Sequence, residues 1–169
     1  MGVKEESLEL ALKMEKESYH YYNNHIEGAE NPLSRKVLES LAAQELDHMD
    51  KVKKIAANKS IEENDYQPED IESQIQKVFE SFSAAEREDW KESNTNIYRH
   101  AMELEQDTYE IYERLAKQTG DDTERKFFEA LMQEEEWHYE SLENVFNYFE
   151  NTGDFYATDE SQTWPWMNI

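Results

Sequence analysis

Three positions in this sequence pair a glutamate with a histidine three residues later, and two of them suit metal ligands. Glu45 is followed by His48, and Glu135 is followed by His138. Residues three apart share one face of an α-helix, so the carboxylate and the imidazole of each pair point in the same direction. Carboxylate oxygens and imidazole nitrogens are donors that iron and manganese accept, whereas calcium prefers oxygen donors alone. The two motifs therefore predict metal ligands on two separate helices.

A third motif with the same spacing, Glu17 and His20, is interpreted as an accident of a glutamate-rich chain. Glu17 lies two residues from Glu15, and this step turns it by about 200° on a helix, away from the apolar face. We expect that pair to face solvent. His25 and His100 have no counterpart elsewhere in the chain and are also predicted to be surface residues.

The sequence contains an internal repeat with a period of 90 residues. Shifting it by that period aligns residues 11–48 with 101–138 without a gap, and ten of these 38 positions are identical. About three identities are expected between unrelated segments of this composition. The chain is therefore predicted to consist of two copies of one supersecondary unit. The identical pairs include Glu15 with Glu105, Tyr19 with Tyr109, Tyr22 with Tyr112, Glu45 with Glu135, and His48 with His138.

Each copy of the repeat has the apolar pattern of a helical hairpin, with apolar residues at steps of three and four on both sides of a break. In the first copy the break is GAENPLS, where Gly28 suits the end of one helix and Pro32 suits the start of the next. In the second copy the break is Gly120, followed by Asp121 and Glu124 in the spacing of a capping box. Two such hairpins predict four long helices with nearly parallel axes.

The segment that joins the hairpins is too long for a simple loop and long enough to run along a bundle. Ile71, Ile75, Val78 and Phe82 keep helical spacing within it and predict one short helix. The expected fold is therefore all-α, a four-helix bundle made of two helical hairpins with a long crossover.

The same pattern gives the expected division of the chain. We expect one bundle domain over residues 1–151, composed of repeats 8–58 and 98–151 and the crossover 59–91. Residues 152–169 form a C-terminal tail with four aromatic side chains, for which packing on the bundle and packing on a second subunit are both open. The aromatic residues of this tail are Phe155, Tyr156, Trp164 and Trp166.

One glutamate interrupts the apolar face near the middle of each predicted long helix. In an antiparallel hairpin, residues equidistant from the turn lie side by side, and the two pairs of glutamates are centred on positions 30 and 120, inside the two breaks. All four carboxylates are therefore predicted to meet at one level. Four buried negative charges would repel one another, and two divalent cations would neutralise them. The predicted centre binds two metal ions, iron or manganese or one of each, through Glu15, Glu45, His48, Glu105, Glu135 and His138.

Two tyrosines lie seven residues after the glutamate of the first helix in each hairpin, which is two turns along the same face. They are Tyr22 and Tyr112, and both positions suit an aromatic residue of the core. The same positions suit a hydroxyl that orients a ligand carboxylate and supplies a proton during catalysis. Tyr19 and Tyr109 repeat as well but lie off the centre of this face, so we interpret them as packing residues.

The composition excludes several classes of function. The chain carries 17 Lys and Arg against 40 Asp and Glu, a formal net charge of −23, and a nucleic acid would be repelled by such a surface. It has no cysteine, which excludes disulfides, thiolate-bound zinc, iron–sulfur clusters and thiol catalysis within these residues. No apolar stretch is long enough to span a membrane, and the first residues lack the apolar core of a signal peptide, so we expect a cytoplasmic protein.

Four segments that span Ala11 to Glu140 resemble the rubrerythrin-type members of the ferritin-like superfamily. They are ALKMEKESYHYY, AQELDHMD, AMELEQDTYEIY and MQEEEWHYE. The resemblance implies a ferritin-like bundle with a dinuclear iron site at the six residues named above. It also implies reduction of hydrogen peroxide, or of dioxygen, in defence against oxidative stress, and commonly a homodimer.

The chain departs from this family pattern in two ways. Full-length rubrerythrins carry a rubredoxin-like domain whose iron is held by four cysteines, so electrons would here come from a separate protein such as a rubredoxin-like one. Many rubrerythrins also have a further glutamate near the third-helix ligand, which permits a change of ligands with redox state. The positions one turn before and after Glu105 are Met102 and Thr108, so we expect a site that stays symmetric.

Two other functions are compatible with the same ligands. One is a ferritin- or bacterioferritin-like ferroxidase that serves iron storage, although Leu46 follows Glu45 where a haem-binding bacterioferritin would carry methionine. The other is a bundle stabilised by metal that performs no catalysis.

Overall fold

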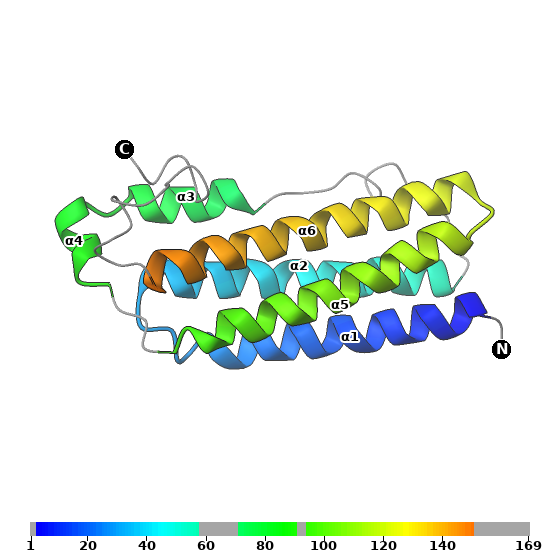
Figure 1. The fold of residues 1–169 in the computed structure, drawn as a ribbon, viewed down its shortest axis with the longest axis horizontal. Helices are drawn as coiled ribbons and strands as arrows, with labels where there is room; N and C mark the ends of the chain where they lie inside the picture. The colour runs from blue at the N-terminus through cyan, green and yellow to red at the C-terminus, as the bar shows by residue number, and fades with distance from the viewer. Residues whose placement is uncertain (1–2, 58–70, 91–93, 151–169) are drawn as a thin grey trace.

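The computed structural model describes residues 3–57, 71–90 and 94–150. Within these residues the chain forms helices joined by turns, with no strand, and four long helices dominate it (Figure 1). They are α1 (Val3–His25), α2 (Pro32–Ala56), α5 (Asn96–Gln118) and α6 (Asp122–Glu150). The predicted all-α bundle of four long helices is confirmed.

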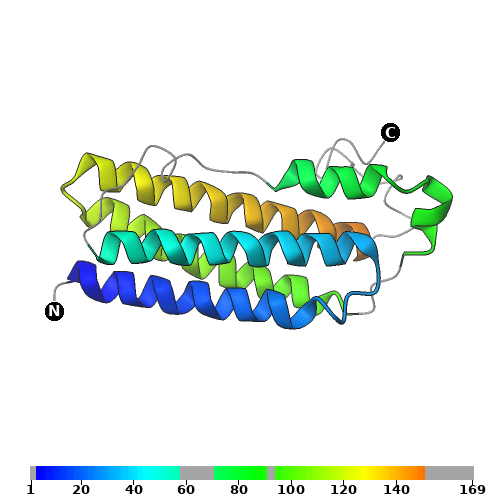
Figure 2. The same ribbon diagram turned by 180° about the vertical axis from the view of Figure 1, so that it is seen from behind.

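The four helices are arranged as two antiparallel hairpins. Helix α1 packs along α2, and α5 packs along α6. The hairpins meet through α1 with α5 and through α2 with α6, as the two opposite views show (Figures 1 and 2). This arrangement brings the middle of each helix to the same level.

Local sequence explains where the helices of each hairpin begin. The side chain of Asn31 accepts a hydrogen bond of 2.8 Å from the backbone N–H of Ser34, and Pro32 occupies the first helical position of α2. Asp121 accepts hydrogen bonds from the backbone N–H groups of Thr123 and Glu124, at 2.8 and 3.1 Å. Both turns thus lie at the breaks predicted from the sequence.

The predicted short helix of the crossover is present as α3 (Glu72–Glu80), and the described part of the crossover contains a second short helix that was not predicted, α4 (Ala84–Glu88). The buried face of the first also differs from the predicted one. It consists of Ile71, Ile75 and Phe79, at steps of four, whereas Val78 and Phe82 are only half-buried. Residues 59–70 of the crossover and the aromatic tail 152–169 lie outside the described residues.

The buried apolar side chains form two clusters, one toward each end of the bundle. Buried polar side chains occupy the level between them. The cluster near the start of α2 includes Tyr22, Leu33, Leu38, Leu41, Tyr98, Ala101, Leu142 and Val145. The cluster near the start of α6 includes Leu8, Ala11, Val52, Ile111, Tyr112, Leu115, Phe127, Phe128 and Leu131.

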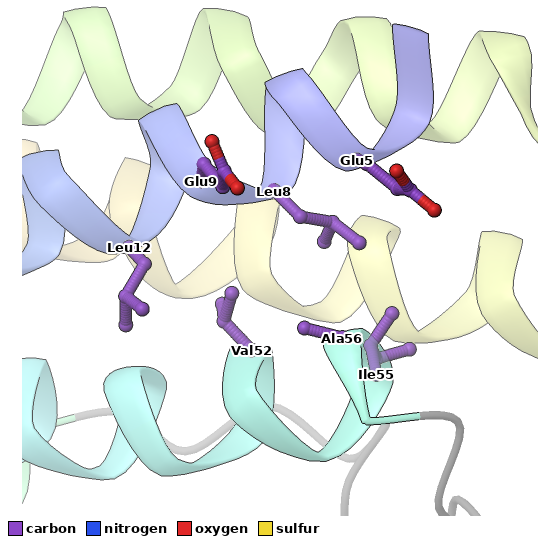
Figure 3. Close-up of a pocket in the computed structure, with 7 residues that line it drawn as sticks. All are labelled: Glu5, Leu8, Glu9, Leu12, Val52, Ile55 and Ala56. Carbon is purple, nitrogen blue, oxygen red and sulfur yellow. The ribbon is translucent and has the colours of Figure 1, made fainter. Parts of the chain in front are cut away.

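A surface hollow lies away from that polar level. It has a volume of about 300 Å³ and separates the first turns of α1 from the last turns of α2 (Figure 3). Its apolar lining includes Leu8 and Val52, with the carboxylates of Glu5 and Glu9 at its edge. Leu8 precedes Glu15 by seven residues, or about 10 Å along the helix axis, so this hollow does not reach the buried acids.

None of the helices in the described ranges combines the length and the apolar character needed to cross a lipid bilayer.

Candidate metal centre

The six predicted ligand residues all point into the middle of the bundle. Each of the four long helices contributes one glutamate, and α2 and α6 each add a histidine. Each of these residues is at most 1% exposed to solvent. Charged residues are almost never buried so completely without a partner, so this cluster requires a counter-charge.

The donor atoms form two overlapping groups of four. One group consists of Glu15, Glu45, His48 and Glu135, and its donor atoms all lie within 4.8 Å of one another. The second group consists of Glu45, Glu105, Glu135 and His138, with the same spread of donor atoms. The glutamates of the two Glu-x-x-His motifs belong to both groups, whereas each of the other four residues belongs to one. Such an arrangement matches two neighbouring metal positions with two shared carboxylates.

The two imidazole rings present the same nitrogen to the acids. Nδ1 of His48 lies 2.9 Å from Glu135 and 3.4 Å from Glu15. Nδ1 of His138 lies 3.1 Å from Glu45 and 3.3 Å from Glu105. The rings face each other, with centroids 5.5 Å apart and planes inclined by 14°. The glutamate of the same motif lies 3.8 Å from each Nδ1, so each of these nitrogens is placed among three carboxylates from different helices.

Three carboxylate oxygens at the centre test whether a metal fits. The Oε2 atoms of Glu15, Glu45 and Glu135 are buried and accept no hydrogen bond from any residue that the structure describes. A buried polar atom without a partner destabilises a protein by several kcal/mol in an apolar medium, on the order of 2–7. Divalent cations between the acids would satisfy these oxygens, so the donor set fits a pair of such ions.

Comparison with known proteins agrees with this geometry. The model of the rubrerythrin family matches residues 6–146, which include all six residues of the centre. This chain belongs to the rubrerythrin family. Rubrerythrins are ferritin-like di-iron domains, so the predicted family and fold are confirmed. No curated protein and no solved structure gives a match to the chain.

Two tyrosines of this rubrerythrin-family chain link its hairpins at the centre. The hydroxyl of Tyr22 donates a short hydrogen bond to Oε1 of Glu105, and that of Tyr112 donates one of 2.5 Å to Oε1 of Glu15. Both tyrosines are fully buried. Burial, followed by the charges of the facing carboxylates, raises the pKa of each hydroxyl well above its ordinary value, so both remain protonated donors. Each tyrosine is thus a core aromatic and also a donor to a carboxylate, and the supply of a proton during catalysis stays a prediction.

Two residues next to the shared glutamates, the half-buried Gln44 and the buried Glu134, were missed by the sequence analysis. Nε2 of His48 donates to Oε2 of Glu134 at 3.0 Å, and Nε2 of His138 donates a short hydrogen bond to Oε1 of Gln44. Gln44 and Glu134 occupy equivalent positions in the two repeats. An alignment of the two repeats that counts only identical residues does not identify Gln44 and Glu134. An alignment that also counts positions where both residues carry a hydrogen-bond acceptor includes them.

Without metal, protons reduce the charge of the centre. Burial alone would lower the pKa of His48, but the facing carboxylates Glu15 and Glu134 outweigh it and raise this pKa to about 10. Burial acts on His138 in the same direction, and facing acids, chiefly Glu105, raise its pKa to about 10 as well. Both imidazoles are therefore cationic at neutral pH in the metal-free protein.

The carboxyl groups respond to the same crowding. Burial and the charges of Glu105 and Glu15 raise the pKa of Glu135 well above its ordinary value, so this shared glutamate holds a proton. For Glu105 burial acts upward too, but the charge of His138 and several hydrogen bonds outweigh it and lower its pKa. The metal-free centre thus carries protons in the place where cations would neutralise it.

The positions around Glu105 explain why α5 supplies a single carboxylate to the two donor groups. One turn later stands Thr108, whose hydroxyl donates to the backbone oxygen of Leu104 at 2.9 Å. One turn earlier stands Met102, a half-buried residue that packs on the apolar cluster near the start of α2. The further glutamate of many rubrerythrins is therefore replaced by side chains that are satisfied or apolar.

A small pocket on α5 and α6 is lined in part by residues of the centre. It has a volume of about 180 Å³, and the buried ligand residues Glu105 and Glu135 are part of its lining. The remaining lining residues are Gln106, Tyr109, Glu136 and Tyr139.

The other histidines lie away from the centre. His20 and its neighbour Glu17 are exposed, as the sequence analysis predicts for an accidental motif. His100 is exposed as well, but the predicted surface position of His25 is only partly right. His25 is half-buried, since its ring packs 4.4 Å from that of Tyr21 and its Nδ1 lies 2.7 Å from the backbone oxygen of the same residue.

Proposed function

We propose that this protein is a di-iron oxidoreductase that reduces hydrogen peroxide, or dioxygen, with electrons from a separate redox protein. The observation that carries the proposal is the pair of four-donor groups that share two glutamates. Two ferrous ions held there would supply the two electrons that, together with two protons, convert one hydrogen peroxide molecule into two of water.

Each residue of the centre has a distinct place in this proposal. Glu15 and His48 would hold one ion, and Glu105 and His138 would hold the other. Glu45 and Glu135 would serve both ions, because they alone belong to both groups. Manganese or a mixed pair fits the same donors.

Tyr22 and Tyr112 hold protons beside the centre. Their hydroxyls donate to Glu105 and Glu15 and so fix the orientation of these carboxylates before any substrate arrives. Reduction of peroxide to water consumes protons. Each of these two buried hydroxyls donates directly to a carboxylate that would bind an ion, so each could supply a proton near the substrate.

The pocket between α5 and α6 supports a small substrate. Its volume of about 180 Å³ is below the roughly 300–1,000 Å³ of pockets that bind drug-sized ligands. Peroxide and dioxygen are small enough to use it, and its lining includes Glu105 and Glu135. We infer that the oxidant reaches the centre by this route.

The electrons come from outside the described centre in this proposal. No cysteine occurs in the 169 residues, so the chain lacks the four thiolates of a rubredoxin-type iron site. A rubredoxin-like protein is the class of donor that we propose. We extend the proposal to a homodimer, which is the common assembly of the family.

A rapid-mixing experiment tests the function. Purified protein is loaded anaerobically with two Fe(II) per chain and mixed with either hydrogen peroxide or dioxygen, and absorbance follows oxidation of the iron. We expect fast oxidation by peroxide and slower oxidation by dioxygen. His48→Ala should abolish the fast phase, whereas His20→Ala, in the exposed copy of the motif, should leave it intact.

The result also separates the alternatives. Oxidation that is faster with dioxygen, by a protein that elutes as a large cage, would support iron storage instead. Failure of both oxidants to react would overturn the proposal of an enzyme.

A further inference from the structure

The two histidines of the centre differ in the partners of their outer nitrogens. Nε2 of His48 donates to a carboxylate, that of Glu134, at 3.0 Å. Nε2 of His138 donates to a neutral amide oxygen, that of Gln44. The six residues of the centre obey the repeat, so this pair of acceptors breaks an otherwise symmetric arrangement.

The difference matters because the negative acceptor is buried. The side chain of Glu134 is 2% exposed, so little water screens its charge from the imidazole of His48. A hydrogen bond to an ionised acceptor is roughly twice as strong as one between neutral groups. In the neutral form of the ring, which is the form that binds a metal, a carboxylate at Nε2 therefore holds the proton there. It leaves the lone pair of Nδ1 directed toward the centre and makes the ring a stronger metal ligand.

A nearby lysine, Lys51, stabilises the ionised carboxylate of Glu134 but is shared with a second acid. Nζ of Lys51 lies 3.5 Å from Oε1 of Glu134 and closer, at 3.1 Å, to the exposed Asp47. Lys51 thus offers Glu134 a cationic neighbour that it shares with another acid. The equivalent position in the second repeat is Ser141, whose hydroxyl donates to Glu72 of α3 at 2.5 Å. The position equivalent to Lys51 thus carries a hydroxyl in place of an ammonium group, and the asymmetry extends beyond the two acceptors.

We propose that Glu134 and Gln44 are positioning residues that make the two metal positions unequal. The position at His48 and Glu15 binds a divalent ion more tightly and fills first, and the position at His138 and Glu105 fills second. The inference rests on the metal centre of the proposed function. It concerns the order of binding, which that proposal leaves open.

Zinc provides a probe that is silent in redox chemistry and accepts these donors. Metal-free protein labelled with ¹⁵N in its five histidines is titrated with Zn²⁺, and NMR follows the ring nitrogens. Residues that hydrogen-bond to ligating histidines change metal affinity by about 10–100-fold, so at one Zn²⁺ per chain about nine tenths or more of the first ion should be at His48. Signals of the exposed His20 and His100 should stay unchanged.

Exchanging the acceptors tests the cause. Glu134→Gln should weaken metal binding at the His48 position, and Gln44→Glu should strengthen it at the His138 position. In either variant the two positions should have similar affinities, so the His48 and His138 signals should change together. The double exchange should make His138 change first. Glu129→Gln, which removes an exposed charge from the same helix, should keep His48 first.

The outcomes separate this inference from the function itself. Parallel changes at His48 and His138 in the unaltered protein would overturn the unequal positions, as would an unchanged order in Glu134→Gln. If Glu134→Gln fails to fold by circular dichroism, Gln44→Glu carries the same test from the other side. Failure of Zn²⁺ to perturb either histidine would overturn the metal centre, and the proposed function with it.

Discussion

Tyr112, on α5, donates a hydrogen bond of 2.5 Å to Glu15, on α1. Tyr22, on α1, makes the equivalent bond to Glu105, on α5. Each tyrosine shares a helix face with the glutamate of its own repeat but donates to the glutamate of the other repeat. Each hairpin therefore orients a carboxylate of the other hairpin. One hairpin alone would have neither four carboxylates nor the hydroxyls that orient them, so the centre depends on the contact between α1 and α5.

Removal of one tyrosine hydroxyl should destabilise the metal-free protein. In Tyr112→Phe, Oε1 of Glu15 loses a buried donor, which should lower the free energy of unfolding by about 1–3 kcal/mol. Urea titration followed by circular dichroism measures the change. Tyr109→Phe, on the same helix but only half-buried, is the control and should differ little from the unaltered protein. Equal stability of the two variants would contradict the role of the buried bond.

The stability of the metal-free protein should fall as pH rises from about 7 to 10. His48 and His138 have a pKa of about 10 in the folded protein, well above the value of about 6.5 in the unfolded chain. Their contribution is thus fully present below pH 6.5 and is lost as pH rises through 10. The proton on Glu135 acts in the same direction, since its pKa is also raised by folding. Thermal unfolding across this pH range measures the trend.

Bound metal provides the control for that trend. Two divalent ions would take the place of the protons, so the zinc-loaded protein should show a much weaker dependence in the same window. Calorimetric titration in buffers of different ionisation enthalpy should show that roughly two to three protons leave per two Zn²⁺ at neutral pH. Release of no protons would mean that the imidazoles are already neutral in the metal-free protein.

The bundle could be predicted because its apolar periodicity and its repeat are properties of the sequence alone. The second crossover helix could not, since α4 buries no residue and thus leaves no apolar pattern. Its start depends on a local capping box, in which Ser83 and Glu86 exchange side-chain to backbone hydrogen bonds. The sequence pattern could not show that Phe79, and not Val78, lies on the buried face of α3. That face is set by which side of α3 packs on α2, and this is a tertiary contact.

The level of the four central glutamates could be predicted by counting residues from the two turns, because antiparallel helices keep that register. Glu134 was missed for a physical reason. It stands in a run of three glutamates, of which Glu135 faces the centre and Glu136 faces solvent. Glu134 is buried because His48 and Lys51 of α2 pack against it. The residue pattern of α6 alone does not predict this contact.

Loss of a shared ligand should affect both ions, whereas loss of an unshared ligand should affect one. In Glu45→Ala both four-donor groups lose a member, so we expect the protein to retain less than one tightly bound Zn²⁺ per chain. In Glu15→Ala only one group is altered, and we expect one tightly bound ion. Glu17→Ala removes an exposed charge from the same helix and should keep two. Metal analysis after dialysis measures the content, and two ions retained by Glu45→Ala would contradict the shared role.

Narrowing the pocket between α5 and α6 should slow access without changing the amount of metal bound at equilibrium. Tyr139 lines this pocket beside the buried Glu105 and Glu135, and replacement by tryptophan adds bulk at its wall. Stopped-flow mixing should show several-fold slower oxidation of the ferrous protein by peroxide in Tyr139→Trp. Tyr19→Trp is a suitable control, because Tyr19 is the repeat counterpart of the pocket residue Tyr109 and lies on the α1 side. If both variants react at the unaltered rate, the oxidant reaches the centre by another path.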